Sequence, residues 1–472
     1  MTWAKSSAVK RTNPGLRLEL GDVHAQGPRA LAGTVADALR HAVRAGRLPA
    51  GTRLPASRSL AADLQVSRGV VVRAYEQLTA EGYLLARTGR GTVVGDVPAT
   101  EGDPPPPSRP FVPTNPGVPA LGWFPRTEWL RAMETALREL PDAELGYGDP
   151  RGHPRLRAAL AAYLGRTRAV VAPVDRIVVT AGFAQATRLV AETLAAQGVT
   201  AIGVEDPGSV GVIETLRRGG LTTCPVPVDE HGLDVAALSA GDLRAVAVTP
   251  AHQFPTGAVL GPARRTALLE WAGARQAVVV EDDYDAEYRY DRSPVGALQG
   301  LAPERVVYGG SISKTLAPGL RLGWLVAPAR LAAALVERKH WADIAAPVLE
   351  QVALAALIES GGLDRHLRRT AARYADRRRR LLTAVARHLP DWTVTGIAAG
   401  LHAVLVPGAP VPAAALEEMA AAGPDVGAVP LAAYRHGSAP CSGLVVGYGA
   451  ATPDRIDRAV ADMAARAPLR LR

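Results

Sequence analysis

Cysteine is nearly absent from this 472-residue chain, which contains only Cys224 and Cys441, far apart in sequence. This usage is typical of reduced thiols and leaves no metal-binding signature, so we expect no metal site. There is also no uninterrupted apolar run of the roughly 18 residues that a membrane-spanning helix needs. The N-terminus MTWAKSSAVKR carries no apolar signal segment. We therefore expect a cytoplasmic protein with no membrane partner.

Lysine is almost as scarce. Only 4 of the 54 basic residues are lysines, namely Lys5, Lys10, Lys314 and Lys339. Arginine therefore takes most positions at which any cation would serve. Because arginine does not lose its proton and cannot attack a carbonyl, a lysine retained in mid-chain is a candidate for amine chemistry.

The positive charge is concentrated at one end of the chain. The net charge is +9, and residues 1–95 hold 14 lysines and arginines against 6 aspartates and glutamates. A concentrated basic domain is typical of a protein that binds a polyanion such as DNA. A merely solvated basic surface is the alternative that charge alone leaves open.

The basic segment has the pattern of three helices and a hairpin. Apolar residues recur at helical spacing from Arg29 to Gly46, and SRSLAADL predicts a short helix with Ser57 as its N-cap. A third helix is expected from the cap Ser67 to Gly82. YLLAR and TVVG flank a Thr-Gly-Arg-Gly turn, which predicts a β-hairpin. Residues 26–95 are therefore expected to form a winged helix-turn-helix.

Two further regions follow the basic segment. Residues 96–118 are proline-rich and predict an extended linker. Residues 119–470 alternate short apolar strands with helices, which predicts an α/β domain with a mostly parallel sheet, and after about residue 345 a smaller C-terminal α+β lobe. The strand candidates are RIVVT, TAIGV, AVAVT, AVVVE, VVYGG and LGWLV.

The N-terminal segment LPASRSLAADLQVSRGVVVRAYEQLTAEGYLLARTGRGTVV resembles the winged-helix domain of GntR-type regulators over roughly residues 29–95. The resemblance implies a double-stranded DNA operator as partner. The residues expected at the DNA lie at the starts of the second and third helices, one turn further along the third helix, or on the wing: Arg58, Ser67, Arg68, Arg73 and Arg90. The run Gly69–Val72 departs from the polar or basic residues that this family often has in mid-helix, so base readout would rest on few side chains.

The segment GGSISKTLAPGLRLGW, residues 309–324, resembles the Schiff-base segment of fold-type I aminotransferases. The resemblance implies that Lys314 forms an imine with the aldehyde of pyridoxal 5'-phosphate (PLP), which requires a neutral amine. It also implies that Ser311 and Ser313 donate hydrogen bonds to the phosphate and that Arg321 grips it with a bidentate fork.

The segment VVVEDDYDAEYRY, residues 278–290, resembles the part of these proteins that holds the cofactor ring. A carboxylate at the end of a buried strand needs a cationic partner, and the protonated pyridine nitrogen supplies one. The resemblance assigns Asp282 to this nitrogen, with Asp283 as the alternative, and Tyr284 to the phenolic oxygen. Carboxylates that merely end the strand are the structural alternative.

Three other segments fit the same resemblance. TAGFAQAT predicts a strand–glycine–helix junction whose N–H groups at Gly182, Phe183 and Ala184 face an anion. AHQFPTG resembles the turn beside the cofactor ring. GYGDPRGHPRLRAALAAYL resembles the segment whose tyrosine, here Tyr147, reaches the phosphate of the neighbouring subunit, which implies a head-to-tail homodimer.

The fusion of these two domains resembles the MocR/GabR subfamily of GntR-type transcription regulators, in which the aminotransferase-like domain usually senses PLP or an amine or amino-acid effector. Two departures favour sensing over catalysis. Ser209 stands where aminotransferases stack an aromatic ring on the cofactor, and the late strand SGLVVGYG has valine where they clamp the substrate carboxylate. Arg435 is the candidate substitute for that clamp. A working aminotransferase with an appended DNA-binding domain and an empty scaffold remain the alternatives.

Overall fold

The computed structural model describes residues 31–87, 91–97, 116–291, 295–438 and 441–468. The chain divides into two compact units, Met1–Phe111 and Val112–Arg472. Within the described residues, no helix is long and apolar enough to cross a membrane.

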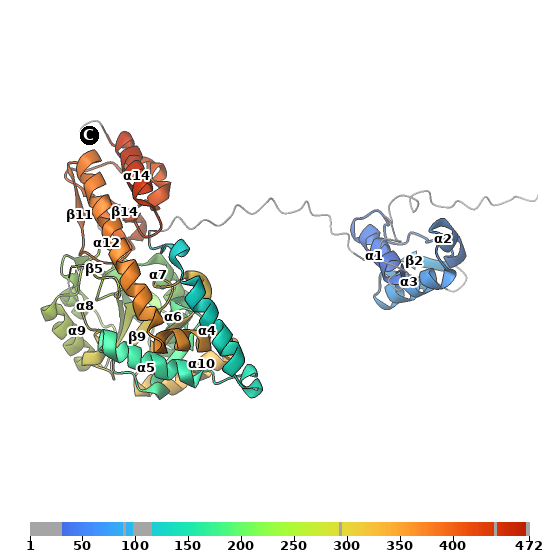
Figure 1. The fold of residues 1–472 in the computed structure, drawn as a ribbon, viewed down its shortest axis with the longest axis horizontal. Helices are drawn as coiled ribbons and strands as arrows, with labels where there is room; N and C mark the ends of the chain where they lie inside the picture. The colour runs from blue at the N-terminus through green and yellow to red at the C-terminus, as the bar shows by residue number, and fades with distance from the viewer. Residues whose placement is uncertain (1–30, 88–90, 98–115, 292–294, 439–440, 469–472) are drawn as a thin grey trace, which may run out of the picture. The chain divides into compact units, whose positions relative to one another are not determined.

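The first unit is a winged helix-turn-helix, as predicted (Figure 1). Its elements are α1 (Leu31–Arg44), α2 (Ser57–Asp63), α3 (Arg68–Ala80) and the antiparallel hairpin of β1 (Leu84–Arg87) and β2 (Gly91–Val94). One apolar core joins all of them and includes Val35, Leu39, Leu60, Val71, Leu78 and Leu84.

The helix starts differ in detail from the prediction. Ala56, not Ser57, is the N-cap of α2, so the predicted cap was wrong by one residue. Ser67 is the N-cap of α3, although its side chain makes no capping hydrogen bond. Val70 and Val71 are buried in the core of the unit, so the apolar run in the third helix serves packing.

The second unit is built on an eight-stranded sheet with the order β3-β10-β9-β8-β7-β4-β5-β6. Neighbouring strands from β5 across to β9 are parallel, whereas β10 is antiparallel to both of its neighbours and β6 to β5. All six predicted strands are present, and β5 and β6 are additional. The strands are β3 (Ile177–Thr180), β4 (Ala201–Asp206), β5 (Thr222–Asp229), β6 (Gly232–Leu233), β7 (Ala245–Val248), β8 (Val278–Asp283), β9 (Val306–Ser311) and β10 (Gly323–Val326).

Helices cover both faces of this sheet. One face packs against α6 (Phe183–Ala196), α7 (Val210–Arg218) and α10 (Ala329–Asp343). The other packs against α5 (Pro154–Arg168), α8 (Val235–Ser239), α9 (Pro262–Ala274) and α11 (Val348–Glu359), with α4 (Arg126–Glu139) lying on α11. Side chains alternate between the faces, because Val278 and Val280 enter the first core and Val279 the second.

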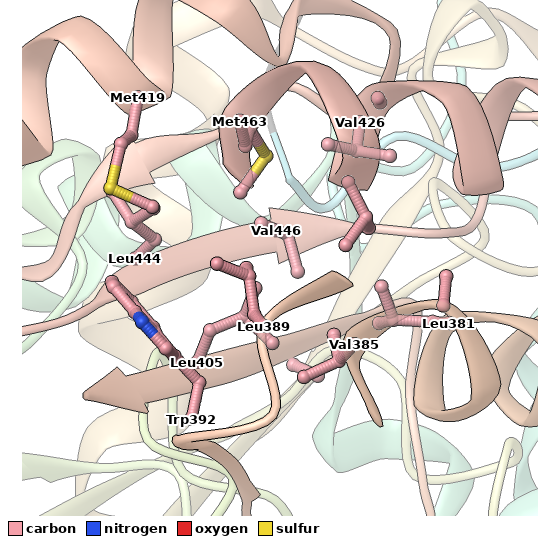
Figure 2. Close-up of a cluster of buried hydrophobic side chains, with 14 of the residues drawn as sticks. Leu381, Val385, Leu389, Trp392, Leu405, Met419, Val426, Leu444, Val446 and Met463 are labelled. Atoms are coloured by element: carbon pink, nitrogen blue, oxygen red, sulfur yellow. The ribbon is translucent and has the colours of Figure 1, made fainter. Parts of the chain in front are cut away.

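The predicted smaller α+β lobe follows. The long helix α12 (Gly362–His388) runs from the large lobe into it (Figure 1). Its four-stranded antiparallel sheet has the order β11-β12-β14-β13. The lobe consists of β11 (Trp392–Thr395), β12 (His402–Pro407), α13 (Ala413–Ala422), β13 (Val429–Pro430), β14 (Leu444–Gly447) and α14 (Pro453–Arg466). Figure 2 shows side chains from α12, β11, β12, β14, α13 and α14 meeting in one apolar core.

Candidate functional site

A cavity of about 460 Å³ opens at the carboxyl ends of the parallel strands of the large sheet. Ligands bind at this edge in open α/β sheets. Eight of the predicted site residues line the cavity: Phe183, Ala184, Asp282, Tyr284, Ser311, Ser313, Lys314 and Arg321. These residues are separated by up to 138 positions in sequence, and the fold brings them to a single site.

Lys314 lies on the turn that follows β9, and its Nζ donates a hydrogen bond to the carbonyl oxygen of Gly117 at 2.7 Å. Burial lowers the pKa of this amine, and the negative charges of Asp285 and Asp282 oppose that shift. A lowered pKa increases the fraction of neutral amine, which is the form that attacks an aldehyde.

The alternation of strand β8 separates the two candidate aspartates. Asp282 lines the cavity, and its Oδ1 is buried without a hydrogen-bond partner among the described residues. Burial, followed by the nearby charge of Asp283, raises the pKa of Asp282 well above its usual value. Asp283 lies on the other face of the sheet, where it accepts hydrogen bonds from Arg168 Nε at 2.7 Å and Tyr308 Oη at 2.6 Å. Asp282 is therefore the aspartate that can reach a ligand.

Tyr284 also faces the cavity, and its hydroxyl lies beside a buried histidine and aspartate. The Oη of Tyr284 is 3.1 Å from Nδ1 of His252, and the same Nδ1 is 3.0 and 3.1 Å from the two carboxylate oxygens of Asp285. His252 is 4% exposed and Asp285 is 2% exposed. The three side chains form a local network around a single N–H group.

An anion cradle lies at the N-terminus of α6. Gly182 is the N-cap with a φ of 82°, and a Cβ at this position would lie 2.9 Å from Nη2 of Arg321. Arg321 itself has a φ of 50° and donates to the carbonyl oxygen of Ala181 at 2.6 Å. Arg321 therefore lies close to the start of α6, whose first-turn N–H groups have no partner within the helix, and Ser311 and Ser313 line the same cavity.

The residues of this cavity fit PLP. The unpartnered oxygen of Asp282 matches a protonated ring nitrogen, and the cradle at Gly182 and Arg321 matches a phosphate. Lys314, with its lowered pKa, matches the aldehyde. Asp282, Lys314 and Arg321 line the same cavity, as the binding of one molecule by all three requires.

Within the described residues, the positions expected to hold an amino-acid substrate place no cation in the cavity. Ser209 lines the cavity but also caps α7, where its Oγ accepts from Val212 N at 3.4 Å. In the late strand, Val445 and Val446 are fully buried in the small lobe. Arg435 does not line the cavity within the described residues; its Nη2 is 3.4 Å from Oδ2 of Asp206.

Tyr147, which was predicted to reach a phosphate, is another residue that does not line the cavity of Lys314 in the single chain. It is 91% exposed and borders a separate cavity of about 520 Å³, which Asp343 and Ile344 also line. Its predicted contact with the phosphate of a neighbouring subunit remains a prediction.

Four of the five predicted DNA-contacting side chains are exposed: Arg58, Ser67, Arg68 and Arg73. Arg58 lies in the first turn of α2, Ser67 caps α3, and Arg68 and Arg73 lie in its first two turns. Arg90 lies outside the described residues. The exposed arginines at the two helix N-termini offer cations where phosphate binding is favoured.

Some cavity residues were not predicted from the sequence. Phe254 lines the cavity from the AHQFPTG turn, with its ring edge-on to Tyr284. His252 comes from the same turn and Asp285 from the segment after β8, and the sequence motifs that contain them predicted no role for either.

Comparisons with known proteins agree with this geometry. Residues 31–94 match the family "Bacterial regulatory proteins, gntR family", and residues 124–421 match "Aminotransferase class I and II". The chain is 34% identical over 444 residues to the probable rhizopine catabolism regulatory protein MocR of Rhizobium meliloti, with 88% of this chain and 89% of that protein covered. It is also 34% identical over 447 residues to the pyridoxine biosynthesis transcriptional regulator PdxR of Corynebacterium glutamicum, with 92% and 96% covered.

Among solved structures, the second unit resembles LysN, an α-aminoadipate aminotransferase of Thermus thermophilus complexed with N-(5'-phosphopyridoxyl)-L-leucine. The sequence identity is 27% and the TM-score 0.67, with 75% of this chain and 91% of that chain covered. The predicted aminotransferase fold of type I is therefore confirmed.

Proposed function

Because the chain belongs to the MocR-type branch of the GntR family of bacterial regulators, we propose that it is a transcription regulator whose aminotransferase-like unit senses PLP, alone or together with an amine or amino-acid ligand. One observation carries the proposal: a winged helix with exposed arginines and a cavity that fits PLP lie on the same chain. A regulator that binds operator DNA acts in the cytoplasm.

Each part of the cofactor would have its own residues. Lys314 would hold the aldehyde carbon, Asp282 the ring nitrogen and Tyr284 the phenolic oxygen. The phosphate would be held by Ser311, Ser313, Arg321 and the N–H groups of Gly182, Phe183 and Ala184. The bound cofactor supplies an electron-withdrawing ring and a carbonyl that accepts amines.

Sensing is favoured over catalysis because the clamp for a substrate carboxylate is weak. Arg435 pairs with Asp206, whose carboxylate also accepts from the backbone N–H groups of His436 and Gly437 at 2.8 and 3.0 Å. A missing bidentate clamp would cost a substrate about 1.5–3 kcal/mol and, with it, the orientation that transamination needs.

We propose the domain boundaries 26–95 for the DNA-binding domain, 96–118 for the linker and 119–470 for the aminotransferase-like domain. A head-to-tail homodimer would bring Tyr147 to the phosphate of the partner's cofactor and set two winged helices against two operator half-sites. Binding of the effector could then change DNA affinity only through its different affinity for two arrangements of the dimer.

A DNA-binding titration of the full chain with and without PLP tests the proposal. We expect a change in affinity or footprint when the cofactor is added, and the Lys314→Ala variant should not show it. Identical affinity and footprint in both arms would refute cofactor-controlled binding.

An active aminotransferase is the second candidate, favoured by the convergence of Lys314, Asp282, Tyr284 and Arg321 in one cavity. Single-turnover absorbance with a panel of amino acids distinguishes the two. Steady turnover of any of them would show that the unit is a catalyst as well as a sensor.

A further inference from the structure

The feature that the proposed function leaves unused is the buried pair of His252 and Asp285 behind Tyr284. Of the described residues, His252, Asp285 and His402 also form one group whose ligand atoms lie within 4.8 Å of one another. Most of these ligand atoms already have hydrogen-bond partners. Nδ1 of His252 is 3.0 and 3.1 Å from the two carboxylate oxygens of Asp285, and Nε2 of His402 is 3.1 Å from the carbonyl oxygen of Pro255. The arrangement is therefore that of a hydrogen-bonded pair, and it does not need a metal ion.

The chemistry of the pair fixes where its hydrogen lies. An ionised carboxylate can only accept hydrogen bonds, so the Nδ1 atom of His252 that faces Asp285 must carry a hydrogen. The hydroxyl oxygen of Tyr284 is 3.1 Å from the same atom. It therefore faces an N–H donor and can only accept from it, so the hydroxyl hydrogen of Tyr284 has to point elsewhere.

The cavity is where that hydrogen can go. Tyr284 lines it together with Asp282 and Lys314. We propose that His252 and Asp285 are positioning residues that keep the Tyr284 hydroxyl hydrogen directed into the cavity, at the phenolic oxygen of the cofactor. This inference rests on the proposed binding of PLP and adds to it a reason for the buried pair.

A donor aimed at the phenolic oxygen stabilises its anionic form. A cofactor whose phenolic oxygen receives this hydrogen bond loses its titrating proton at a lower pH. The absorbance of the bound cofactor, followed against pH, reports the pH midpoint of that proton loss. Other titratable groups act on the pair or on Tyr284 from neighbouring elements: Asp282, Glu205, Glu287, Tyr288, Tyr290, Lys314, His402 and Tyr448. Burial holds the pKa of His402 well below its usual value, so this ring stays neutral over the range of the titration.

The test is a double-mutant cycle on the full chain loaded with PLP, followed by the pH midpoint of its absorbance. Replacing Asp285 by asparagine has two effects: it removes a negative charge, which lowers the midpoint, and it frees His252 to accept from Tyr284, which raises the midpoint. Only the second effect needs the Tyr284 hydroxyl. Asp285→Asn changes the pH midpoint in each background. We expect this change to be about one pH unit more positive when Tyr284 is present than in the Tyr284→Phe background.

Equal shifts in the two backgrounds would overturn the inference, because a charge effect or a general loosening of the fold does not depend on one hydroxyl. His252→Asn retains an N–H group towards Asp285 and is expected to keep the midpoint of the unmodified protein. Asp229→Asn, at an exposed pair with Arg264, is the matched control and should not shift it.

Two further outcomes are decisive. If Asp285→Asn does not fold, His252→Phe removes the same N–H without touching the carboxylate, and its cycle with Tyr284→Phe should show coupling of the same sign; additive shifts would overturn the inference. An unmodified protein without any cofactor absorbance would refute the proposed function together with this inference. A normal absorbance with uncoupled shifts would refute the inference alone.

Discussion

Replacing Asp283 by asparagine is expected to reduce the free energy of unfolding of the second unit by about 3–5 kcal/mol, the usual cost of breaking a buried ion pair. Asp283 accepts from Arg168 Nε and Nη2 at 2.7 and 3.1 Å and from Tyr308 Oη at 2.6 Å. The Arg168 side chain is 1% exposed, so its cation cannot turn to water when the carboxylate is lost. Its bond to the carbonyl oxygen of Val295 would remain as partial compensation.

Replacing the neighbouring Asp282 by asparagine is not expected to reduce the free energy of unfolding. Asp282 has no partner for its Oδ1, and its pKa is raised mainly by burial, so its charge destabilises the cofactor-free protein at neutral pH. Asp282→Asn should therefore leave the unfolding free energy unchanged or increase it. Cofactor binding should weaken roughly 10- to 150-fold, the equivalent of one charge-assisted hydrogen bond of about 1.5–3 kcal/mol.

Urea unfolding of the cofactor-free chain, followed by tryptophan fluorescence, measures the first effect, since every tryptophan in the described part of the chain lies in the second unit. Titration of each variant with PLP, followed by absorbance, measures the second. The assignment of Asp282 is wrong if Asp283→Asn abolishes cofactor binding while its stability is unchanged, or if the two variants lose stability equally.

Three other substitutions test separate parts of the structure. Gly182→Ala would force a side chain into a backbone conformation with φ 82°, next to Arg321, and should weaken PLP binding about tenfold in the same titration. Burial raises the pKa of Glu205 to about 7, so the stability that its protonated form provides is lost as pH rises from about 4.5 to 7. Glu205→Gln should remove up to about 3 kcal/mol of this pH dependence, measured as the difference between the unfolding free energies in urea at pH 5 and pH 8. Arg68→Ala should weaken operator binding and lower the slope of log affinity against log salt by about 1, whereas Arg188→Ala, in the other unit, should change neither.

The parallel strands β4, β7, β8 and β9 could be predicted because their apolar runs are mostly buried and end at turn residues. Strand β5 could not, since its sequence TTCPVPVD contains two prolines and only Val226 is buried within it. The two-residue strand β6 carries too little pattern to predict. Ser57 was taken as a helix cap from its residue type, but the first turn of α2 includes it.

The cofactor site could be predicted as far as its motifs are local in sequence. The motif around Lys314 places the lysine, both serines and Arg321 within eleven residues. The choice between Asp282 and Asp283 needed the face of β8 that each occupies, which depends on the packing of the whole sheet. The contact of His252 with Asp285 joins a turn after β7 to a turn after β8, and nothing in either segment alone indicates it.

Arg435 illustrates how sequence proximity can mislead about a ligand site. Its Nε is buried without a partner in the described part of the chain, and its Nη2 lies 3.4 Å from Asp206, a carboxylate that is 4% exposed. To clamp a ligand, the guanidinium would have to leave Asp206, and the buried carboxylate would then keep only the backbone N–H groups of His436 and Gly437. A ligand carboxylate therefore competes with one that is already in place, whereas PLP, in the proposed site of Lys314, Asp282 and Arg321, makes no demand on Arg435. On this geometry the cavity is better suited to the cofactor itself as effector than to an amino acid that needs a second clamp.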